Sequence, residues 1–423
     1  MKTILLFGAG KSATVLIDYL IAGAENNNWK IIIADVNREQ ILAKTNHHPA
    51  TEAISLDINN SIERKALVEK ATIVISMMPP ALHVIVAEDC LEFSKDLLTA
   101  SYVDEKLKDR SAEIESKGLL FLCEMGLDPG IDHMSAMKMI DDIKSKGGTV
   151  TSFKSHCGGL IAPESDNNPW HYKISWNPRN IVLAGKSGAV YKDENVVREI
   201  SYRQIFSDSS VINIDGLKPL ATYPNRDSLS YIPLYHLEDA STFIRTTLRY
   251  PVFCKAWNLI ARTNLTSENS IDVSGLTYKK WSAPIADFVT EENRSLFSFL
   301  GFFEETNVPS AAGSSADILQ YLLETKLVME PQDKDMIVML HEIEYIINGK
   351  RFAIKSSLIV KGEDSLRTAM AKTVGLPLGI AAKLILDGKI KETGLRIPID
   401  KEIYEPVLEE LALNGIRFQE DIC

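Results

Sequence analysis

The chain has 423 residues, of which 45% are hydrophobic and 24% charged, and its formal net charge is −11. This composition is typical of a globular enzyme with roughly two or three domains and an ample apolar core. The negative charge argues against nucleic acid or an anionic membrane as the main partner, although local arginines can still form a pocket for an acidic small molecule.

The cysteines and the N-terminus bear on the cellular compartment. Met1 leads directly into a strand-like run, and no apolar run reaches about 18 residues, so we expect neither a signal peptide nor a transmembrane helix. Five cysteines form no CxxC pair and no zinc-type spacing, which predicts reduced thiols and a cytoplasmic protein: Cys90, Cys123, Cys157, Cys254 and Cys423.

Strand-like and helix-like segments alternate over residues 1–126. Short Val/Ile/Leu runs predict strands at 2–7, 30–34, 53–56, 73–76, 96–99 and 119–123. Helical periodicity predicts helices at 11–24, 37–45, 61–70, 81–93 and 104–117. This alternation predicts an α/β domain with a doubly wound parallel sheet.

The pattern changes after Gly126. We expect a helix at 130–146, strands at 149–157, 181–191 and 196–202, and a mainly helical part at about 234–330. Two long strand-like runs at 335–347 and 351–361 predict a hairpin that turns at Asn348-Gly349. An amphipathic helix follows at about 364–387, interrupted near Gly375-Leu376-Pro377.

A glycine-rich turn follows the first strand. Gly8, Gly10, Lys11, Ser12 and Ala13 fit the G-x-G-x-x-[G/A] pattern of a Rossmann-like dinucleotide site, in which the phosphates bind at the N-terminus of the following helix. A nucleotide-triphosphate loop would need a glycine where Leu5 stands. We therefore expect a nicotinamide dinucleotide, although such a turn also occurs without a ligand.

Asp35 ends the second strand, where a carboxylate binds the ribose hydroxyls and repels a 2′-phosphate. This favours NAD over NADP, with NADP still possible because Arg38 is near; alternatively, Asp35 only caps the next helix. Since ligands bind at the carboxyl ends of such strands, we expect Asp57 and Ile58 beside the adenine and Ser76 beside the nicotinamide.

Four polar motifs downstream suit an amino-dicarboxylate bound beside a nicotinamide. They are Met125–His133, Ser155–Leu160, Tyr223–Asp227 and Arg245–Tyr250. Arginine suits carboxylates because its planar guanidinium pairs with them through two hydrogen bonds.

These motifs resemble the glutamate-forming saccharopine dehydrogenases, also called saccharopine reductases, which in animals form part of aminoadipate semialdehyde synthase. Further similar segments are Ala100–Tyr102, 166–176 and Ala369–Pro377. The resemblance runs in order along nearly the whole chain and is weakest at 255–330. The chain has His156, Thr246 and Ile161 where the family usually has tyrosine, glycine and proline, and we expect the first two to lie beside the pocket.

The resemblance implies NAD(P)-dependent conversion of saccharopine to L-glutamate and 2-aminoadipate 6-semialdehyde, or the reverse, in lysine metabolism. It also implies that residues 127–363 form a substrate-binding and dimerisation domain, that the segment from about 364 to 423 packs back on the first domain, and that the protein is a homodimer.

The substrate residues that the resemblance implies are Ser101, Tyr102, Asp128, Arg226, Arg245 and Thr247. We expect Arg226 and Arg245 to clamp carboxylates, and Asp128 to pair with the substrate ammonium and to act as the general acid/base. Alternatively, the arginines form surface ion pairs and Asp128 caps a helix that begins at Pro129.

Other polar residues near these motifs have more than one interpretation. Asp132 and His133 either shuttle protons or serve the structure, and Lys173 contacts a carboxylate or pairs with Asp166. We expect no metal, because hydride transfer is driven by the nicotinamide. Two alternative functions remain: a carboxynorspermidine-type reductase, and a non-catalytic dinucleotide-binding protein.

Overall fold

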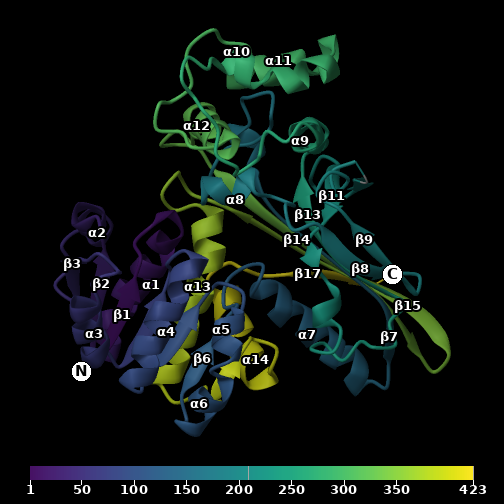
Figure 1. Cartoon of the computed structure of the whole chain (residues 1–423). Helices are drawn as coiled ribbons and strands as arrows, with labels where there is room; N and C mark the ends of the chain where they lie inside the picture. The colour runs from purple at the N-terminus through teal and green to yellow at the C-terminus, as the bar shows by residue number, and fades with distance from the viewer. Residues whose placement is uncertain (208, 423) are drawn as a thin grey trace. The chain divides into compact units, whose positions relative to one another are not determined.

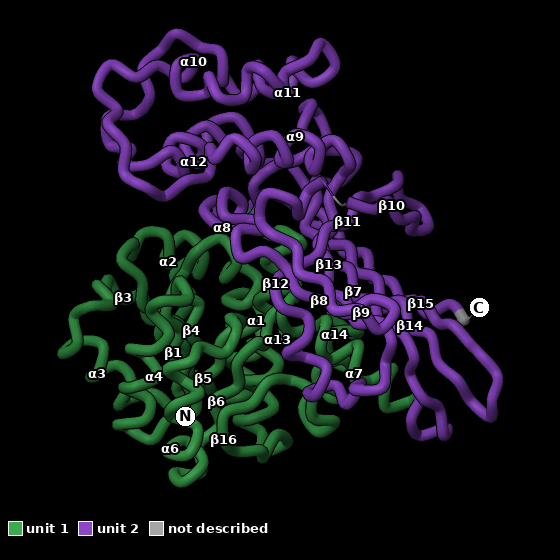
Figure 2. The backbone as a smooth tube through the Cα atoms, turned by 45° about the vertical axis from the view of Figure 1, so that its right-hand side comes forward, with its two compact units in different colours: residues 1–142, 366–417 green, residues 143–365, 418–423 purple. Residues whose placement is uncertain are grey.

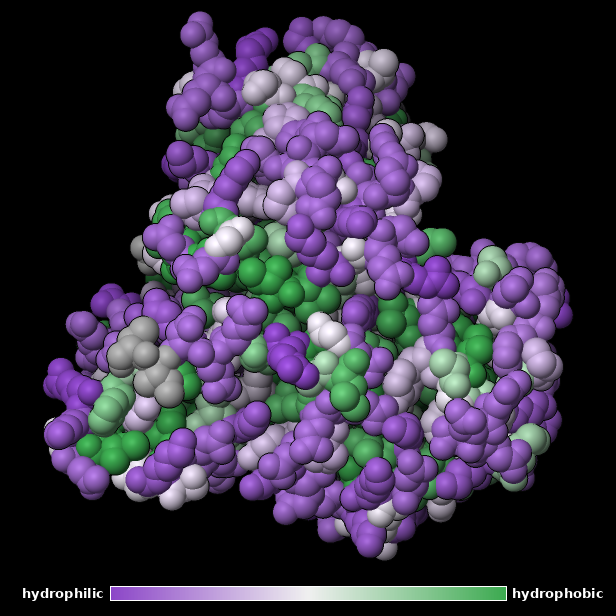
Figure 3. All heavy atoms as spheres, turned by 180° about the vertical axis from the view of Figure 1, so that it is seen from behind, coloured by the Kyte–Doolittle hydropathy of each residue, from purple (hydrophilic) through white to green (hydrophobic). Residues whose placement is uncertain are grey.

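The computed structural model describes residues 1–207 and 209–422, so Cys423 lies outside the described residues. The chain forms two compact units, shown in different colours in Figure 2. Unit 1 comprises Met1–Asp142 and Leu366–Arg417, and unit 2 comprises Ile143–Ser365 and the residues from Phe418 onward. On the face shown in Figure 3, hydrophilic residues cover most of the surface.

Unit 1 is built on a seven-stranded parallel sheet with the order β16-β6-β5-β4-β1-β2-β3. The predicted Rossmann-like doubly wound sheet is therefore confirmed, and β16, which the sequence did not suggest, extends one edge. The strands are β1 (Lys2–Phe7), β2 (Trp29–Asp35), β3 (Thr51–Ser55), β4 (Ile73–Ser76), β5 (Asp96–Thr99), β6 (Leu120–Leu122) and β16 (Gly394–Arg396).

The helices of unit 1 come from both ends of the chain. The single helix predicted at 104–117 is two short helices, α5 and α6. The full set is α1 (Thr14–Asn27), α2 (Arg38–Thr45), α3 (Ser61–Lys70), α4 (His83–Glu92), α5 (Glu105–Lys108), α6 (Ser111–Ser116), α7 (Ile131–Ser145), α13 (Ala369–Leu386) and α14 (Lys401–Leu413). A 3₁₀ turn at Lys11–Ala13 leads into α1.

The first segment of unit 1 runs past residue 126, where the sequence placed a boundary, because most of α7 packs with this unit. Tyr404 of α14 donates a 2.7 Å hydrogen bond from its hydroxyl to the carboxylate of Asp141 on α7. Two residues that are 263 positions apart in the sequence are thereby joined.

Helix α13 is a core helix of unit 1, drawn beside the N-terminal α1 in Figure 1. It continues through Pro377, so the expected interruption is wrong. Gly375 and Gly379 allow close packing on α1: a Cβ at Gly375 would lie 3.0 Å from the backbone nitrogen of Leu16. By length and composition α13 also resembles a membrane-spanning helix, but 72% of it is buried.

Unit 2 is built on a ten-stranded mixed sheet with the main path β10-β11-β13-β7-β14-β15-β17. Its strands are β7 (Thr149–Ile161), β8 (Ala189–Asp193), β9 (Val196–Ile200), β10 (Ser210–Ile212), β11 (Leu220–Pro224), β12 (Arg226–Asp227), β13 (Thr242–Arg249), β14 (Asp335–Ile347), β15 (Lys350–Lys361) and β17 (Gln419–Ile422). The predicted hairpin is β14–β15, with Asn348 and Gly349 both at positive φ.

Two expectations for unit 2 were only partly right. Residues 181–182, at the start of the strand expected at 181–191, instead end helix α8 (Pro178–Val182), because the Asn177 side chain caps a turn that begins at Pro178, and the strand β8 begins only at Ala189. Strand β13 lies within the segment expected to be mainly helical. Its residues alternate between the two faces of a sheet, pairing with β7 on one side and β11 on the other.

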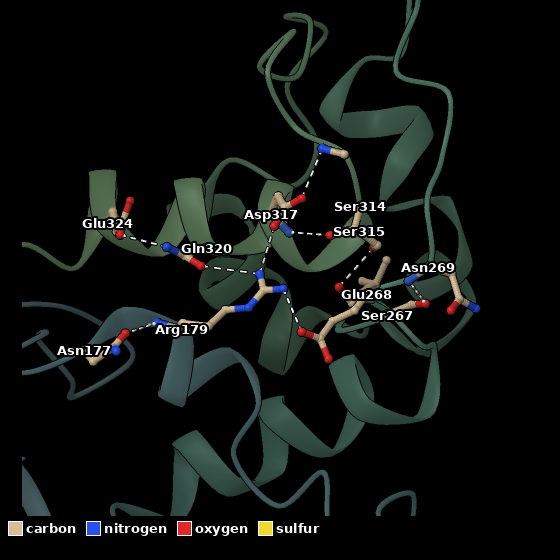
Figure 4. Close-up of polar contacts among 12 residues, drawn as sticks. Asn177, Arg179, Ser267, Glu268, Asn269, Ser314, Ser315, Asp317, Gln320 and Glu324 are labelled. Atoms are coloured by element: carbon tan, nitrogen blue, oxygen red, sulfur yellow. Dashed lines mark hydrogen bonds and ion pairs between the residues drawn. The ribbon is translucent and has the colours of Figure 1, made fainter. Parts of the chain in front are cut away.

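The helical part of unit 2 surrounds an aromatic cluster and consists of α9 (Pro251–Arg262), α10 (Tyr278–Trp281), α11 (Glu291–Leu300) and α12 (Ser315–Lys326). Trp170 packs edge-to-face against Phe253, Trp257 and Phe297. Arg179 of α8 lies 2.9 Å from both Glu268 and Asp317, as Figure 4 shows. These ion pairs are partly exposed, so packing of the aromatic rings stabilises this part more than they do.

Candidate functional site

The glycine turn after β1 has open space on one side and tight packing on the other. Gly8 has a φ of +94°, and a Cβ there would lie 2.9 Å from the carbonyl oxygen of Met77. Gly10 has nothing within 4 Å of the Cβ position. Ala13 is fully buried, whereas Lys11 is exposed and Ser12 half-buried. The turn therefore leaves room for a pyrophosphate at the N-terminus of α1.

Asp35 braces the glycine turn. Its carboxylate accepts a 2.7 Å hydrogen bond from the N–H of Ala9 and a 3.0 Å hydrogen bond from the N–H of Asn37. The side chain of Asn37, and not that of Asp35, caps α2. Arg38, at the start of α2, has a half-exposed side chain whose Nε donates to the carbonyl of Ala53.

The residues expected along the rest of the coenzyme differ in their environments. Asp57 is exposed and accepts the N–H of Asn59 in a local turn. The side chain of Ile58 belongs to the hydrophobic core of unit 1. Ser76 is fully buried, with its hydroxyl 2.8 Å from Nδ1 of His83.

His83, which the sequence analysis missed, connects two expected site residues. Its Nε2 lies 2.8 Å from the hydroxyl of Ser101, so a line of hydrogen bonds runs from Ser76 through the imidazole to Ser101. Burial lowers the pKa of His83 to about 4, so the imidazole is neutral near pH 7. The signal in the sequence was a histidine at the start of the helix after β4, near the carboxyl edge of the sheet.

Glu124 supports the segment that carries Ser101 and Tyr102. Its backbone N–H donates to the carbonyl of Ser101, and its carboxylate accepts the N–H of Val103. The other carboxylate oxygen lies 2.8 Å from Nε2 of His133, which is fully buried. This geometry favours the structural interpretation of His133 over a proton shuttle.

Asp128 lies on the loop after β6, next to the loop after β5. A Cβ on Gly126 would lie 3.0 Å from the Cβ of Ala100, so these two loops are in close contact. Helix α7 begins at Ile131, and the Asp132 carboxylate accepts the N–H of Gly130 at 2.6 Å. Asp128 therefore precedes the N-cap position, and the helix-cap alternative does not describe it. Unit 1 thus gathers Ser101, Tyr102 and Asp128 on adjacent loops.

In unit 2, strand pairing brings the two arginine motifs together. Strand β11 pairs with β13, and the N–H of Asn225 donates to the carbonyl of Arg245 at 2.9 Å. Arg226 follows at once, exposed and at a φ of +54°, a left-handed conformation that is uncommon away from glycine. The Arg245 side chain is buried, with its guanidinium 4.5 Å from the centre of the Tyr231 ring.

Alternation along β13 separates its polar residues. Arg245, Thr247 and Arg249 share one face of the strand, and Thr246 points to the other. Thr247 pairs in register with Tyr223 and Cys157 on the two neighbouring strands. A tyrosine, a threonine and arginines thus share this face of the sheet.

The two family departures His156 and Thr246 form one hydrogen-bonded pair. They are opposite each other in the β13–β7 register, and Nδ1 of His156 lies 2.6 Å from Oγ1 of Thr246. Nε2 of His156 lies 3.3 Å from Glu342, whose pKa this hydrogen bond and Lys355 lower to about 2. These side chains are on the face of β13 and β7 opposite Arg245 and Thr247, and the expectation that they lie beside the pocket stays a prediction.

Lys173 is paired, but not with Asp166. Its ammonium lies 2.6 Å from the carboxylate of Asp333, and both residues are buried. Asp166 instead lies 2.6 Å from Nδ1 of His171. Within residues 1–207 and 209–422, no group of three or more His, Cys, Asp or Glu side chains is placed to hold a metal ion.

Comparisons with known proteins cover the chain from end to end. Residues 4–122 match the family model "Saccharopine dehydrogenase NADP binding domain", and residues 126–416 match "Saccharopine dehydrogenase C-terminal domain". Saccharopine dehydrogenase [NADP(+), L-glutamate-forming] of Saccharomyces cerevisiae is 33% identical over 97% of this chain and 96% of its own length. The apo structure of the L-Glu-forming enzyme from the same yeast superposes with a TM-score of 0.90 at 31% identity, covering 100% of both chains.

Longer relatives match as well. Alpha-aminoadipic semialdehyde synthase of Mus musculus is 34% identical over 99% of this chain but only 47% of its own length. The Arabidopsis thaliana synthase is 32% identical over 99% of this chain and 44% of its own length. The chain therefore spans about half the length of these synthases.

These comparisons overturn the expectation that NAD is favoured. The family model over residues 4–122 is an NADP binding domain, and the full-length relatives from two yeasts are named for NADP(+). The inference from Asp35 failed because it assumed a carboxylate directed at the ribose. In the structure the carboxylate accepts two backbone N–H groups, from Ala9 and Asn37.

Proposed function

This chain belongs to the saccharopine dehydrogenase family, and we propose that it interconverts saccharopine with L-glutamate and 2-aminoadipate 6-semialdehyde, using NADP, in lysine metabolism. The proposal concerns this reaction alone, since the chain corresponds to only part of the longer synthases.

The convergence of the two arginine motifs is the observation that carries the proposal. Saccharopine has three carboxylates, and binding them calls for more than one cationic side chain. The hydrogen bond from Asn225 to Arg245 places Arg226 next to that strand residue, and Thr247 adds a hydroxyl on the Arg245 face. A guanidinium binds a carboxylate through two parallel hydrogen bonds, so this arrangement suits a dicarboxylate end of the substrate.

The residues of unit 1 fit NADP. The open space at Gly10 admits the pyrophosphate, and the crowding of Gly8 against Met77 explains why a side chain is not tolerated there. Arg38, with its half-exposed guanidinium, is the cation we assign to the 2′-phosphate. When bound, the oxidised coenzyme accepts a hydride from the carbon that becomes the aldehyde.

The chain's own residues supply binding and proton transfer. Loss of the N–H proton of the secondary amine and of a hydride from the adjacent carbon leaves an imine; water adds to it, and the carbinolamine collapses to glutamate and the semialdehyde. We assign Asp128 to pair with the substrate ammonium and to move protons during water addition and collapse. Asp128 is half-buried. Arg226, Arg245 and Thr247 orient the carboxylates, and Ser101 and Tyr102 contact the substrate beside Asp128.

The first experiment is an absorbance assay at the reduced-nicotinamide band. Purified protein with saccharopine and NADP should produce reduced coenzyme together with equimolar L-glutamate, and NAD should be the poorer acceptor. Absence of activity in both directions would contradict the proposal. Activity with a carboxynorspermidine-type amine instead of saccharopine would contradict the substrate assignment alone.

A further inference from the structure

His83 touches two residues that the proposed function assigns to different ligands. Ser76 ends β4 on the side expected for the nicotinamide, and Ser101 follows β5 on the side expected for saccharopine. Nδ1 of His83 lies 2.8 Å from the Ser76 hydroxyl, and Nε2 lies 2.8 Å from the Ser101 hydroxyl. One imidazole therefore contacts both sides of the expected reaction.

The surroundings of His83 restrict the motion of Ser101. Ser76, His83 and Thr99 are each at least 96% buried. The N–H of Ser101 donates to Oγ1 of Thr99 at 3.2 Å, and the same Oγ1 lies 3.2 Å from Nε2 of His83. Ser101 is thus fixed at its backbone by Thr99 and at its side chain by His83.

We propose that His83 is a positioning residue that fixes the direction of the Ser101 hydroxyl toward the substrate and couples it to Ser76 on the coenzyme side. The identity of the substrate rests on the proposed function, whereas the hydrogen bonds that join Ser76, His83 and Ser101 do not depend on it. A neutral imidazole has one donor and one acceptor nitrogen, so its tautomer decides whether Ser101 donates to His83 or accepts from it.

His83 does not act as an acid in this arrangement. Burial lowers its pKa to about 4, and the charge of Asp104 acts in the opposite direction. The imidazole is therefore neutral throughout the pH range in which such an enzyme works. A neutral, doubly hydrogen-bonded histidine orients its neighbours without changing its own charge.

A double-mutant cycle tests the coupling. His83→Phe keeps a ring of similar size but removes both hydrogen bonds, and Ser101→Ala removes the hydroxyl. Each single change should lower kcat/KM for saccharopine about 10- to 100-fold, since each leaves a site hydroxyl absent or misdirected. The double variant should be little worse than either single variant. Multiplication of the two losses would overturn the proposal.

Two further variants separate positioning from a general loss of structure. His83→Gln can still donate and accept hydrogen bonds, so it should recover a large part of the activity that His83→Phe loses. His47→Asn changes an exposed histidine of unit 1 and should leave kcat/KM unchanged. Equal losses in His83→Gln and His83→Phe would show that only packing matters at this position.

The hydrogen bonds of His83 can also be tested by NMR, without an activity measurement. In protein labelled with ¹⁵N-histidine, the His83 imidazole should stay neutral from roughly pH 6 to 9. Ser101→Ala should shift the Nε2 resonance and leave Nδ1 nearly unchanged. If wild-type protein fails to oxidise saccharopine, the proposed function falls while this readout still tests the His83–Ser101 link. Unchanged Nε2 in Ser101→Ala would overturn the link itself.

Discussion

The two arginines that we propose as carboxylate clamps differ in how the fold holds them. The Arg245 side chain is buried against the Tyr231 ring in the middle of β13, whereas Arg226 is exposed on a residue with left-handed backbone. A buried arginine serves packing as well as charge, so its replacement has mixed effects on structure and on binding. Arg226 is therefore the better residue for testing a binding role.

Arg226→Ala should raise KM for saccharopine about 10- to 100-fold, because a charge-assisted hydrogen bond contributes about 1.5–3 kcal/mol. The dissociation constant of NADPH, measured by fluorescence titration, should stay nearly the same. Arg198→Ala is the matched control, since Arg198 is an exposed arginine of unit 2 that pairs with Asp193. Equal weakening of substrate and coenzyme would contradict the clamp assignment.

Arg38→Ala should weaken NADPH binding about 10-fold and leave NADH binding nearly unchanged, because only NADPH carries the 2′-phosphate. Both coenzymes are measured on the same variant, so a general loss of stability would weaken the binding of NADPH and NADH alike and would not change their ratio. Arg110→Ala, at another half-exposed arginine of unit 1, provides the control. An unchanged ratio of the two affinities would remove Arg38 from the phosphate site.

At the scale of elements, His156 on β7 and Thr246 on β13 form a pair across two neighbouring strands. The resemblance to the family implies tyrosine and glycine at these positions, a large side chain opposite an empty space. Here a smaller imidazole faces a threonine, and the two are joined by a 2.6 Å hydrogen bond. We infer that the two departures compensate for each other in volume across the sheet.

His156→Tyr alone should destabilise the protein by about 1–3 kcal/mol, because the larger ring is forced against Thr246. Adding Thr246→Gly should recover at least about 1 kcal/mol of this loss, a coupling typical of residues in contact. Thermal unfolding of the wild type, both single variants and the double variant measures the cycle. Additive losses would show that the two residues do not share space.

The sequence predicted the elements whose signals are local. Short apolar runs located β1 to β6, and glycine motifs located the turn at Gly8 and Gly10 and the β14–β15 hairpin at Asn348-Gly349. It did not predict β13 in the helical segment or β16 at the sheet edge, because both depend on partners far away in the chain. For the same reason it missed His83, whose contacts with Ser76 and Ser101 form only when β4 and β5 lie side by side. It also misjudged Asp35, whose carboxylate accepts the N–H of Ala9 in the glycine turn.

At the scale of the whole molecule, each of the two units is built from two separate segments of the chain. Unit 1 needs residues 366–417, which supply β16 to the sheet edge and α13 against α1. Glycines on α13 approach the helix that begins at the coenzyme turn: the Cβ position at Gly375 is 3.3 Å from the carbonyl oxygen of Ser12. The C-terminal segment therefore packs against the turn at which we propose that the coenzyme binds.

A chain ending at Ser365 should lose NADPH binding, because unit 1 would lack its core helix α13 and would expose the apolar side of α1. A chain ending at Arg417 lacks only the strand β17, which pairs with β15 in unit 2, and should keep coenzyme affinity close to that of the full chain. NADPH fluorescence titration of the two truncated proteins compares these outcomes directly. If the shorter chain binds NADPH as well as the longer one, residues 366–417 are an accessory to the dinucleotide fold and not part of it. If only the longer chain binds, coenzyme binding requires segments from both ends of the sequence. The first 126 residues alone then predict the sheet, but not all the contacts around its glycine turn, because some of these come from α13.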